Sequence, residues 1–434
     1  MKRYVIGALV LAAAAAAGAV MYQEYASDQE YGRLIAAGDE ALVGDQPLQA
    51  LEAYSGAIAL RPDSMLAHLK RGMIYRTRGE HNQALKDLLL AVELDPTATH
   101  PAEVLADTLF SLERYDQAAA RYQTYLSLDD RSPQVWYKLG LAQYRAGQIM
   151  AASEALERAL ALDQRLAEAH LLLGLCRRDL GRLPAARASL ETATRLAPAL
   201  TAPREALASL SLVSGDTGRA IDQLEALAAI DPTQPNRLVA VGLANARARR
   251  YEAALLALNR AVERFPDEAA VYAALGRVWL EVAEVREDET ALRKAVEALT
   301  TAASHPDATS TALADLGRAR LMLGDAAAAE RALVQAVERL PVDPEAHLHL
   351  ASLARRTGRL QQARDALIRY ATLVGDAEPL TSIATQIASD SIRLGEPQIA
   401  LRWIDRAVDD DGLTPTLVAL RRRAEAARVA APPD

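Results

Sequence analysis

The side chains of this sequence that could act as nucleophiles or metal ligands are few and scattered. Seven histidines and one cysteine, Cys176, are spread over 434 residues, and metal sites and nucleophilic catalysis use these residue types often. His347 and His349 are close in sequence, but residues two apart on a helix point in different directions, so the spacing disfavours a shared metal ion. Cys176 lies among leucines, which favours a packing role. A single cysteine allows neither an intrachain disulfide nor a Cys-based metal site.

No catalytic motif accompanies these residues. No combination of Ser, His and an acidic residue follows a nucleophile signature, and the sequence has neither a phosphate-binding loop nor a Gly-rich dinucleotide loop. The 57 acidic residues are interspersed with 49 Lys and Arg, as on solvated helix faces. The sequence therefore predicts that the protein is not an enzyme and binds no metal, cofactor or small-molecule substrate.

The composition favours helices and a protein partner. The chain is 51% hydrophobic but only 4% aromatic, and its abundant Ala and Leu lose little conformational freedom in a helix. The formal net charge is −8, and no basic block or stripe is present. Because phosphate binding needs clustered positive charge, this excludes nucleic acid as the expected partner.

The N-terminus predicts a membrane segment over residues 4–22. Lys2 and Arg3 precede an uncharged apolar run from Tyr4 to Tyr22, and Glu24 begins an acidic stretch after it. As a helix this run would be about 28 Å long, close to the hydrocarbon core of a bilayer, which is about 30 Å thick. Basic residues before the run and acidic residues after it place the N-terminus in the cytoplasm and the rest of the chain across the membrane.

Two interpretations of this segment stay open. In the first it is an uncleaved signal anchor, which its spanning length and the tyrosines at positions 4, 22 and 25 favour. In the second it is a signal peptide cleaved after Ala17-Gly18-Ala19, which the six consecutive alanines of residues 12–17 favour, because alanine inserts only weakly. Both interpretations export the remaining residues.

Most of the sequence repeats with a period of 34 residues. A Gly or Ala recurs eight times at this spacing, and an Ala follows twelve residues later in the first seven repeats. A Leu or Tyr then follows after four more residues, one helical turn away on the same face. The recurring Gly or Ala residues are Gly38, Gly72, Ala106, Gly140, Gly174, Ala208, Gly242 and Gly276.

This pattern resembles the tetratricopeptide repeat, which reads W-x2-L-G-x2-Y, then A-x3-F, then P. The fourth repeat shows it most plainly, with Trp136, Leu139, Gly140, Ala152 and Leu156. The resemblance covers about residues 31–412 and implies an all-α fold: a right-handed α-α superhelical solenoid of about eleven helical hairpins. The expected repeats start near residues 31, 65, 99, 133, 167, 201, 235, 269, 310, 344 and 381.

The physical reason for the pattern is close packing of two antiparallel helices. Gly or Ala in the first helix lets the second helix approach, and the Leu or Tyr fills the core. Gly79 and its equivalents suit helix C-termini in the turns. His68, His170 and His347 stand where the family carries Trp, so we expect them to replace its packing.

Two irregularities interrupt the period. The Ala expected at 288 is found at Ala295, and the intervening acidic stretch of residues 281–290 is interpreted as two longer helices, or else as a projecting tip used for docking. A slip of three residues follows near residues 375–379. The predicted division is therefore an N-terminal segment (1–30), a solenoid (31–412), and a capping helix with a short tail (413–434).

The resemblance also implies a partner-binding groove lined by the first helix of each hairpin. The aromatic and Arg residues among these positions are frequent hot-spot types at protein interfaces, although each aromatic could instead pack between hairpins. The fifth position of each repeat carries no Lys, which argues against the subtype that grips chaperone C-termini. The groove of the later repeats is expected to be plainer and rich in Ala. The predicted groove residues are Met73, Arg76, Asp107, Phe110, Tyr137, Leu141, Tyr144, Arg145, Leu171, Leu175 and Arg178.

These features predict a protein-binding scaffold of a bacterial envelope. In the leading interpretation it is anchored once in the inner membrane, with the repeats in the periplasm, and recruits partners for envelope assembly or export. In the alternative it is a soluble periplasmic chaperone that holds unfolded chains after signal-peptide cleavage.

Overall fold

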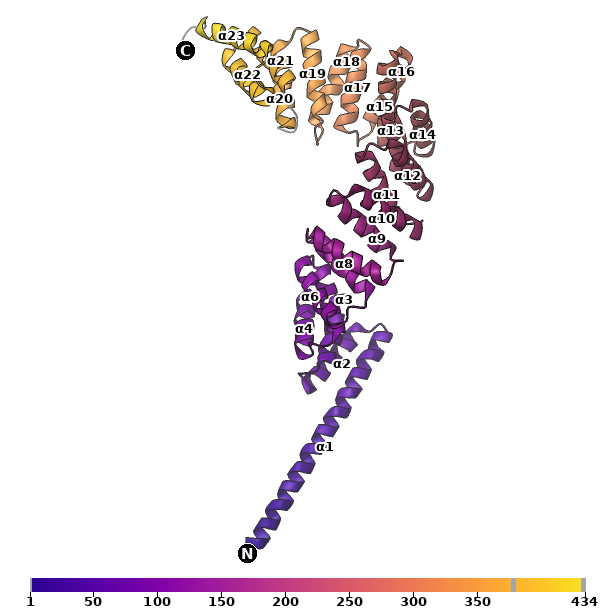
Figure 1. Cartoon of the computed structure of the whole chain (residues 1–434), viewed down its shortest axis with the longest axis vertical. Helices are drawn as coiled ribbons and strands as arrows, with labels where there is room; N and C mark the ends of the chain where they lie inside the picture. The colour runs from indigo at the N-terminus through magenta and orange to yellow at the C-terminus, as the bar shows by residue number, and fades with distance from the viewer. Residues whose placement is uncertain (1, 376–379, 431–434) are drawn as a thin grey trace. The chain divides into compact units, whose positions relative to one another are not determined.

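The protein consists of α helices arranged in consecutive hairpins (Figure 1). The computed structural model describes residues 2–375 and 380–430, with side chains described for residues 16–375, 380–409 and 412–429. Within these ranges there are 23 helices and no strand. The all-helical architecture predicted from the sequence is therefore confirmed.

The chain divides into two compact units, residues 1–210 and 211–434. The helices of the first unit pair in the order α1 with α2 through α9 with α10. The bounds are α1 Lys2–Val43, α2 Pro47–Leu60, α3 Met65–Thr77, α4 His81–Leu94, α5 Thr99–Ser111, α6 Tyr115–Leu128, α7 Pro133–Arg145, α8 Ile149–Leu162, α9 Ala167–Asp179 and α10 Leu183–Leu196. Helix α11, Thr201–Val213, crosses the boundary between the units.

The second unit contains the hairpins from α13 onward and ends on a single helix, α23, that packs on α21 and α22. The bounds are α12 Thr217–Ile230, α13 Pro235–Arg247, α14 Tyr251–Arg264, α15 Ala269–Arg286, α16 Glu289–Ser304, α17 Ser310–Met322, α18 Ala326–Glu338, α19 Pro344–Arg356, α20 Leu360–Val374, α21 Thr381–Arg393, α22 Pro397–Asp411 and α23 Pro415–Ala430.

The close approach of the two helices of a hairpin explains the recurring glycine. A Cβ atom added at Gly140 would lie 2.7 Å from Cγ of Leu156 and 3.2 Å from the carbonyl oxygen of Ala152. Leu156 itself is fully buried. The glycine on α7 therefore leaves the space that the leucine of α8 occupies, as the sequence pattern predicted.

The turn inside each hairpin uses a left-handed residue. Gly147, between α7 and α8, has φ +78°, a conformation that glycine adopts without steric cost. Three hairpins place another residue at the equivalent position, Asp45 with φ 53°, Glu113 with φ 59° and Arg249 with φ 56°. The geometry of the turn is thus kept even where the glycine signal is absent from the sequence.

Two of the three histidines at the Trp position, His68 and His170, make the same contact as the tryptophan. Nε1 of Trp136 donates a hydrogen bond to the carbonyl oxygen of Asp130, six residues earlier, at 2.8 Å. Nε2 of His170 lies 3.0 Å from the carbonyl oxygen of Gln164, and Nε2 of His68 lies 3.0 Å from that of Pro62. In these two repeats the imidazole therefore takes over both the packing and the hydrogen bond of the indole.

The acidic stretch near residue 281 lengthens a hairpin. Helices α15 and α16 have 18 and 16 residues, whereas α13 and α14 have 13 and 14. Glu284 of α15 forms an ion pair with Arg318 of α17 at 2.6 Å. The additional residues thus extend both helices, in agreement with the first interpretation of this stretch. At least one of the acidic side chains, Glu284, forms an ion pair within the second unit.

The N-terminal half of α1 extends beyond its hairpin with α2 (Figure 1). Among the residues with described side chains, no helix is both long and apolar enough to span a membrane. The side chains of residues 4–15, which belong to the predicted membrane segment, are not among those described. Residues 376–379 of the second irregularity and the tail 431–434 lie outside the described residues.

Candidate functional site

All of the predicted groove residues lie on first helices of the first unit. Met73 and Arg76 are on α3 and Asp107 and Phe110 are on α5, while the other seven are on α7 and α9. Neighbouring first helices contact each other, α3 with α5 and α7 with α9. Arg145 is exposed and the other ten residues are partly buried. We call this surface, formed by α3, α5, α7 and α9, the first-helix face.

The aromatic residues on this face also pack into the core. Tyr137, Leu141, Tyr144 and Leu175 contact the buried cluster around Leu156 and Leu172. Burial raises the pKa of Tyr137 and of Tyr144 above their ordinary value. Each side chain thus has a packed side and an accessible side.

Tyr144 belongs to a small polar network with α9. Its hydroxyl donates a hydrogen bond to Oδ2 of Asp179 at 3.0 Å. Nε of Arg178 donates to Oδ1 of the same carboxylate at 2.8 Å. Arg178 is therefore partly neutralised by a neighbour that the sequence-based prediction did not include.

Asp107 forms hydrogen bonds with neighbouring helices of the fold. It accepts hydrogen bonds from the hydroxyl of Tyr122 at 2.5 Å and from Nζ of Lys138 at 2.9 Å. Lys138 also donates to Glu103 at 2.8 Å. Burial by itself would lower the pKa of Lys138, but its hydrogen bonds to Glu103 and Asp107 raise it, so the lysine stays charged. The network ties α5, α6 and α7 together.

The same network occurs two repeats earlier. Asp39 accepts from the hydroxyl of Tyr54 at 2.5 Å and from Nζ of Lys70 at 2.6 Å. Burial, and then the carboxylate, raise the pKa of Tyr54 above its ordinary value. The signal that could have revealed this network is the recurrence of Asp, Tyr and Lys at a spacing of 68 residues, twice the repeat length.

Two arginines of the first-helix face have no such partner. Within the part of the chain that the structure describes, neither Arg76 nor Arg145 forms an ion pair or a side-chain hydrogen bond. Met73 lies three residues before Arg76 on α3, and Phe110 of α5 occupies the position of Arg76 one repeat later. The ring of Phe110 meets that of Tyr115 edge-on at 5.3 Å between centroids. The face thus offers two available guanidinium groups beside apolar side chains.

The first helices of the second unit carry more charge than the sequence predicted. Arg277 of α15 donates to Oδ2 of Asp315 of α17 at 2.8 and 2.9 Å. Burial raises the pKa of Asp315 and that of Glu281 above their ordinary values. These charged side chains lie on the same first helices as Ala270, Ala273 and Ala314, where the sequence predicted a plainer groove. The extent of the groove in the second unit stays a prediction.

The residues first considered for catalysis are not assembled into a site. In the described ranges no group of three or more His, Cys, Asp or Glu is placed to hold a metal ion. Cys176 is fully buried, and burial raises the pKa of its thiol to about 12, so the nucleophilic thiolate does not form near neutral pH.

Family models of two tetratricopeptide repeat types match the chain. One, described as tetratricopeptide repeat, matches residues 35–99, 137–201 and 314–378. The other, described as TPR repeat, matches residues 106–147. Together they cover just over half of the chain.

Two curated proteins show local similarity. The chain is 31% identical over 106 residues to small glutamine-rich tetratricopeptide repeat-containing protein 2 of Mycosarcoma maydis, covering 24% of this chain and 30% of that protein. It is 27% identical over 118 residues to the cell division cycle protein 27 homolog of Caenorhabditis elegans, covering 26% of this chain and 15% of that protein. The chain thus spans less than a third of the length of either relative.

Among solved structures, YrrB, a TPR protein with an unusual peptide-binding site, is 21% identical. The match covers 44% of this chain and 97% of YrrB, with a TM-score of 0.39. With its repeated helical hairpins, its recurring Gly–Leu contact and these family-model matches, the chain belongs to the tetratricopeptide repeat family.

Proposed function

We propose that this chain is a non-catalytic scaffold that binds a protein partner on its first-helix face. Tetratricopeptide repeat proteins generally mediate protein–protein interactions. The observation that carries the proposal is the pair of arginines, Arg76 and Arg145, that have no partner within the described residues and lie on a face with half-buried aromatic side chains. Arginine and aromatic residues in such settings contribute much of the binding energy at interfaces.

The binding residues in this proposal are the predicted eleven, and their contacts support two different roles. Arg76 and Arg145 would bind acidic or carbonyl groups of the partner, and Met73, Phe110, Tyr137 and Tyr144 would bind its apolar side chains. Asp107 and Arg178 would act mainly by holding neighbouring helices in place, because Lys138 and Asp179 already pair with them.

The proposal also includes the N-terminal segment. We infer that residues 4–22 anchor the chain once in a bacterial inner membrane, with the repeats in the periplasm, and that the partner belongs to envelope assembly or export. The uncharged run after Lys2 and Arg3 supports this, as does the strong exposure of Met21 and Tyr22 on α1, 71% and 73%. The proposed division into residues 1–30, 31–412 and 413–434 follows from it.

Charge reversal on the first-helix face tests the scaffold. In a crosslinked pull-down of tagged full-length protein from whole cells, the double variant Arg76→Glu, Arg145→Glu should lose its partner, because both side chains would then repel the acidic groups that they bind. We expect recovery of that partner to fall by at least about tenfold.

The control is Arg165→Glu, which reverses an exposed arginine outside the first-helix face. It should leave recovery unchanged. One or two proteins that disappear only in the double variant would establish a specific scaffold. A diffuse set of clients, equally recovered with all variants, would contradict it and favour the alternative, a soluble periplasmic chaperone.

The fate of the N-terminus separates these two candidates independently. For the anchored scaffold, the mature protein should sediment with membranes and retain Lys2 and Arg3, and protease added to spheroplasts should digest the repeats. Cell fractionation, N-terminal sequencing and protease accessibility measure this. A mature N-terminus just after Ala19 in the soluble periplasmic fraction would favour the chaperone, and repeats protected from protease in intact spheroplasts would contradict export altogether.

A further inference from the structure

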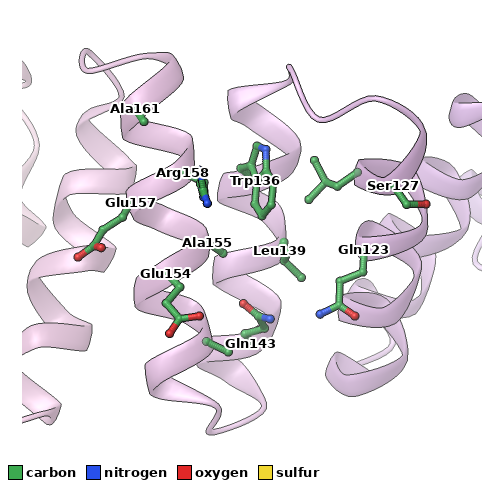
Figure 2. A pocket seen from close by; sticks show the side chains of 12 residues that line it. Gln123, Ser127, Trp136, Leu139, Gln143, Glu154, Ala155, Glu157, Arg158 and Ala161 are labelled. Atoms are coloured by element: carbon green, nitrogen blue, oxygen red, sulfur yellow. The ribbon is translucent and has the colours of Figure 1, made fainter.

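A pocket of about 860 Å³ is lined by α6, α7 and α8, and none of the predicted groove residues lines it. Its floor is α7, with Trp136, Leu139 and Gln143 spaced along it, and its walls are the second helices α6 and α8 (Figure 2). Helix α7 contacts both of these walls. On α8 the wall contains Ala151, Ala155 and Ala161, whose small side chains leave the pocket open above its floor.

The floor carries a buried polar group without a partner. Gln143 is only 4% exposed, and its Oε1 accepts no hydrogen bond from any residue that the structure describes. A buried acceptor without a donor is costly for a folded protein, and such groups are rare. A bound segment that supplies an N–H group at this point would remove that cost.

The aromatic floor and the unpaired acceptor are absent from the equivalent groove three repeats later. Between α12 and α14 the equivalent pocket has a volume of about 340 Å³, with Leu238 in place of Trp136 and Asn245 in place of Gln143. Nδ2 of Asn245 donates a hydrogen bond to the carbonyl oxygen of Val241 at 3.0 Å, so part of its amide is satisfied within its own helix. The aromatic floor and the unpaired acceptor distinguish the pocket between α6 and α8.

The charged residues on the α8 wall indicate which charge a ligand of this pocket should carry. Glu157 pairs with Arg177 of α9 at 3.0 Å. Arg158, at the same level of the pocket as Trp136 (Figure 2), has no ion-pair partner in the described residues. Glu154 lies one helical turn from Arg158, beside Gln143, where it would repel a second acidic group but attract an N–H donor.

We propose that the pocket between α6 and α8 binds an extended segment of a partner protein that carries a large apolar side chain next to an acidic one. The apolar side chain packs on Trp136 and Leu139, the acidic side chain pairs with Arg158, and a backbone N–H donates to Oε1 of Gln143. An extended segment fits better than a helix, because extended backbone leaves its N–H groups available along its length, whereas a helix uses all but those of its first turn internally. This site goes beyond the proposed function, since none of the predicted groove residues lines it.

The test uses defined peptides and a signal from the pocket floor. The chain has three tryptophans, Trp136, Trp279 and Trp403, so the full-length protein labelled with 5-fluorotryptophan gives three ¹⁹F resonances, and Trp136→Phe identifies one. The probes are capped Gly/Ser-rich nonapeptides with one Phe followed by Asp, Lys or Ser. We expect the Asp peptide to shift the Trp136 resonance alone and to bind about tenfold more tightly than the Lys peptide.

A charge-reversal variant in the pocket and a matched control outside it should affect peptide preference differently. Arg158→Glu should reverse the preference, so that the Lys peptide binds more tightly than the Asp peptide. Arg260→Glu, at the equivalent position of α14, should leave the preference unchanged. Gln143→Leu should weaken all three peptides by a similar factor, since it removes the acceptor without changing the charge.

Three results would overturn the proposal: no peptide shifts the Trp136 resonance, the preference for Asp survives Arg158→Glu, or Arg260→Glu alters it equally. The double variant Arg76→Glu, Arg145→Glu separates this site from the proposed function. If peptide binding persists while the cellular partner is lost, both proposals hold. If the double variant keeps its cellular partner but the peptides still bind, only the scaffold proposal fails.

Discussion

Replacing Asp87 with alanine should lower the free energy of unfolding of the first unit by about 3 to 5 kcal/mol, because it leaves a charged partner without its counter-ion inside the fold. Asp87 is 3% exposed. Its carboxylate accepts hydrogen bonds from Nε and Nη2 of Arg71 at 2.6 and 2.9 Å, and it lies 3.0 Å from Nδ1 of His68.

The cost arises from the environment of Arg71. At the position of Arg71, the next three repeats carry leucine: Leu105, Leu139 and Leu173. Its guanidinium therefore lies where a core side chain is expected, and Asp87 compensates for its charge. Removing only the carboxylate leaves the guanidinium partly desolvated and unpaired.

The fourth repeat of the same chain suggests a variant that should restore the lost stability. Two repeats later, Trp136, Leu139 and Ala155 stand at the positions of His68, Arg71 and Asp87. The triple variant His68→Trp, Arg71→Leu, Asp87→Ala should therefore recover most of the lost stability, because apolar side chains of suitable shape can replace a buried ion pair at little cost. The gain would come from apolar packing like that of the fourth repeat.

Urea unfolding followed by circular dichroism measures both effects. Asp63→Ala, at an exposed position in the turn just before this repeat, is the matched control and should change stability by less than about 0.5 kcal/mol. If Asp87→Ala cost no more than the control, the network of Asp87, Arg71 and His68 would not contribute to stability as described.

The helical hairpins could be predicted from the sequence because one local constraint recurs. In each hairpin that carries the Gly–Leu pair, the glycine of the first helix leaves the space that the leucine of the second helix fills. At Gly317, for example, an added Cβ would lie 2.4 Å from Cγ of Leu333. Such a contact requires particular residue types at a fixed spacing. Their recurrence every 34 residues can therefore be recognised from the sequence alone.

The polar contacts of the candidate site could not be predicted in the same way. The hydrogen bond from Tyr144 to Asp179 joins residues 35 apart, and the pairing of Lys138 with Asp107 joins residues 31 apart. These separations depend on how one hairpin stacks on the next and on which rotamers fit there. The period places such residues on neighbouring first helices, but it does not tell which carboxylate each cation meets.

The pocket between α6 and α8 was not visible in the sequence for a related reason. Every repeat has a groove between consecutive second helices, and its depth depends on the side chains that fill it. Trp136 was recognised as a packing residue, but Gln143 carried no signal, because only the structure shows that its acceptor is buried and unpaired. Accessible space and unsatisfied polar atoms are properties of packing and not of residue type.

Acidification should destabilise the second unit through His349. Burial, and then the charge of Arg318, lower the pKa of this imidazole from 6.5 to about 4. The unfolded chain therefore takes up a proton on His349 near pH 6.5, whereas the folded chain takes it up only near pH 4. Between these values the unfolded state binds more protons, so stability falls as the pH falls. The loss is about 1.4 kcal/mol for each pH unit below about 6.5 and levels off near pH 4, at about 3 kcal/mol in total.

The measurement compares the urea unfolding free energy at pH 7.5 and pH 5 for the wild type and for His349→Leu, which cannot take up a proton. Other groups also titrate in this range, so the diagnostic quantity is the difference between the two proteins. The wild type should lose about 2 kcal/mol more than the variant. His81→Gln, at an exposed position, should behave like the wild type. Equal losses in wild type and His349→Leu would mean that the folded chain accepts the proton on His349 as readily as the unfolded chain does, and that Arg318 and burial do not hold this imidazole neutral.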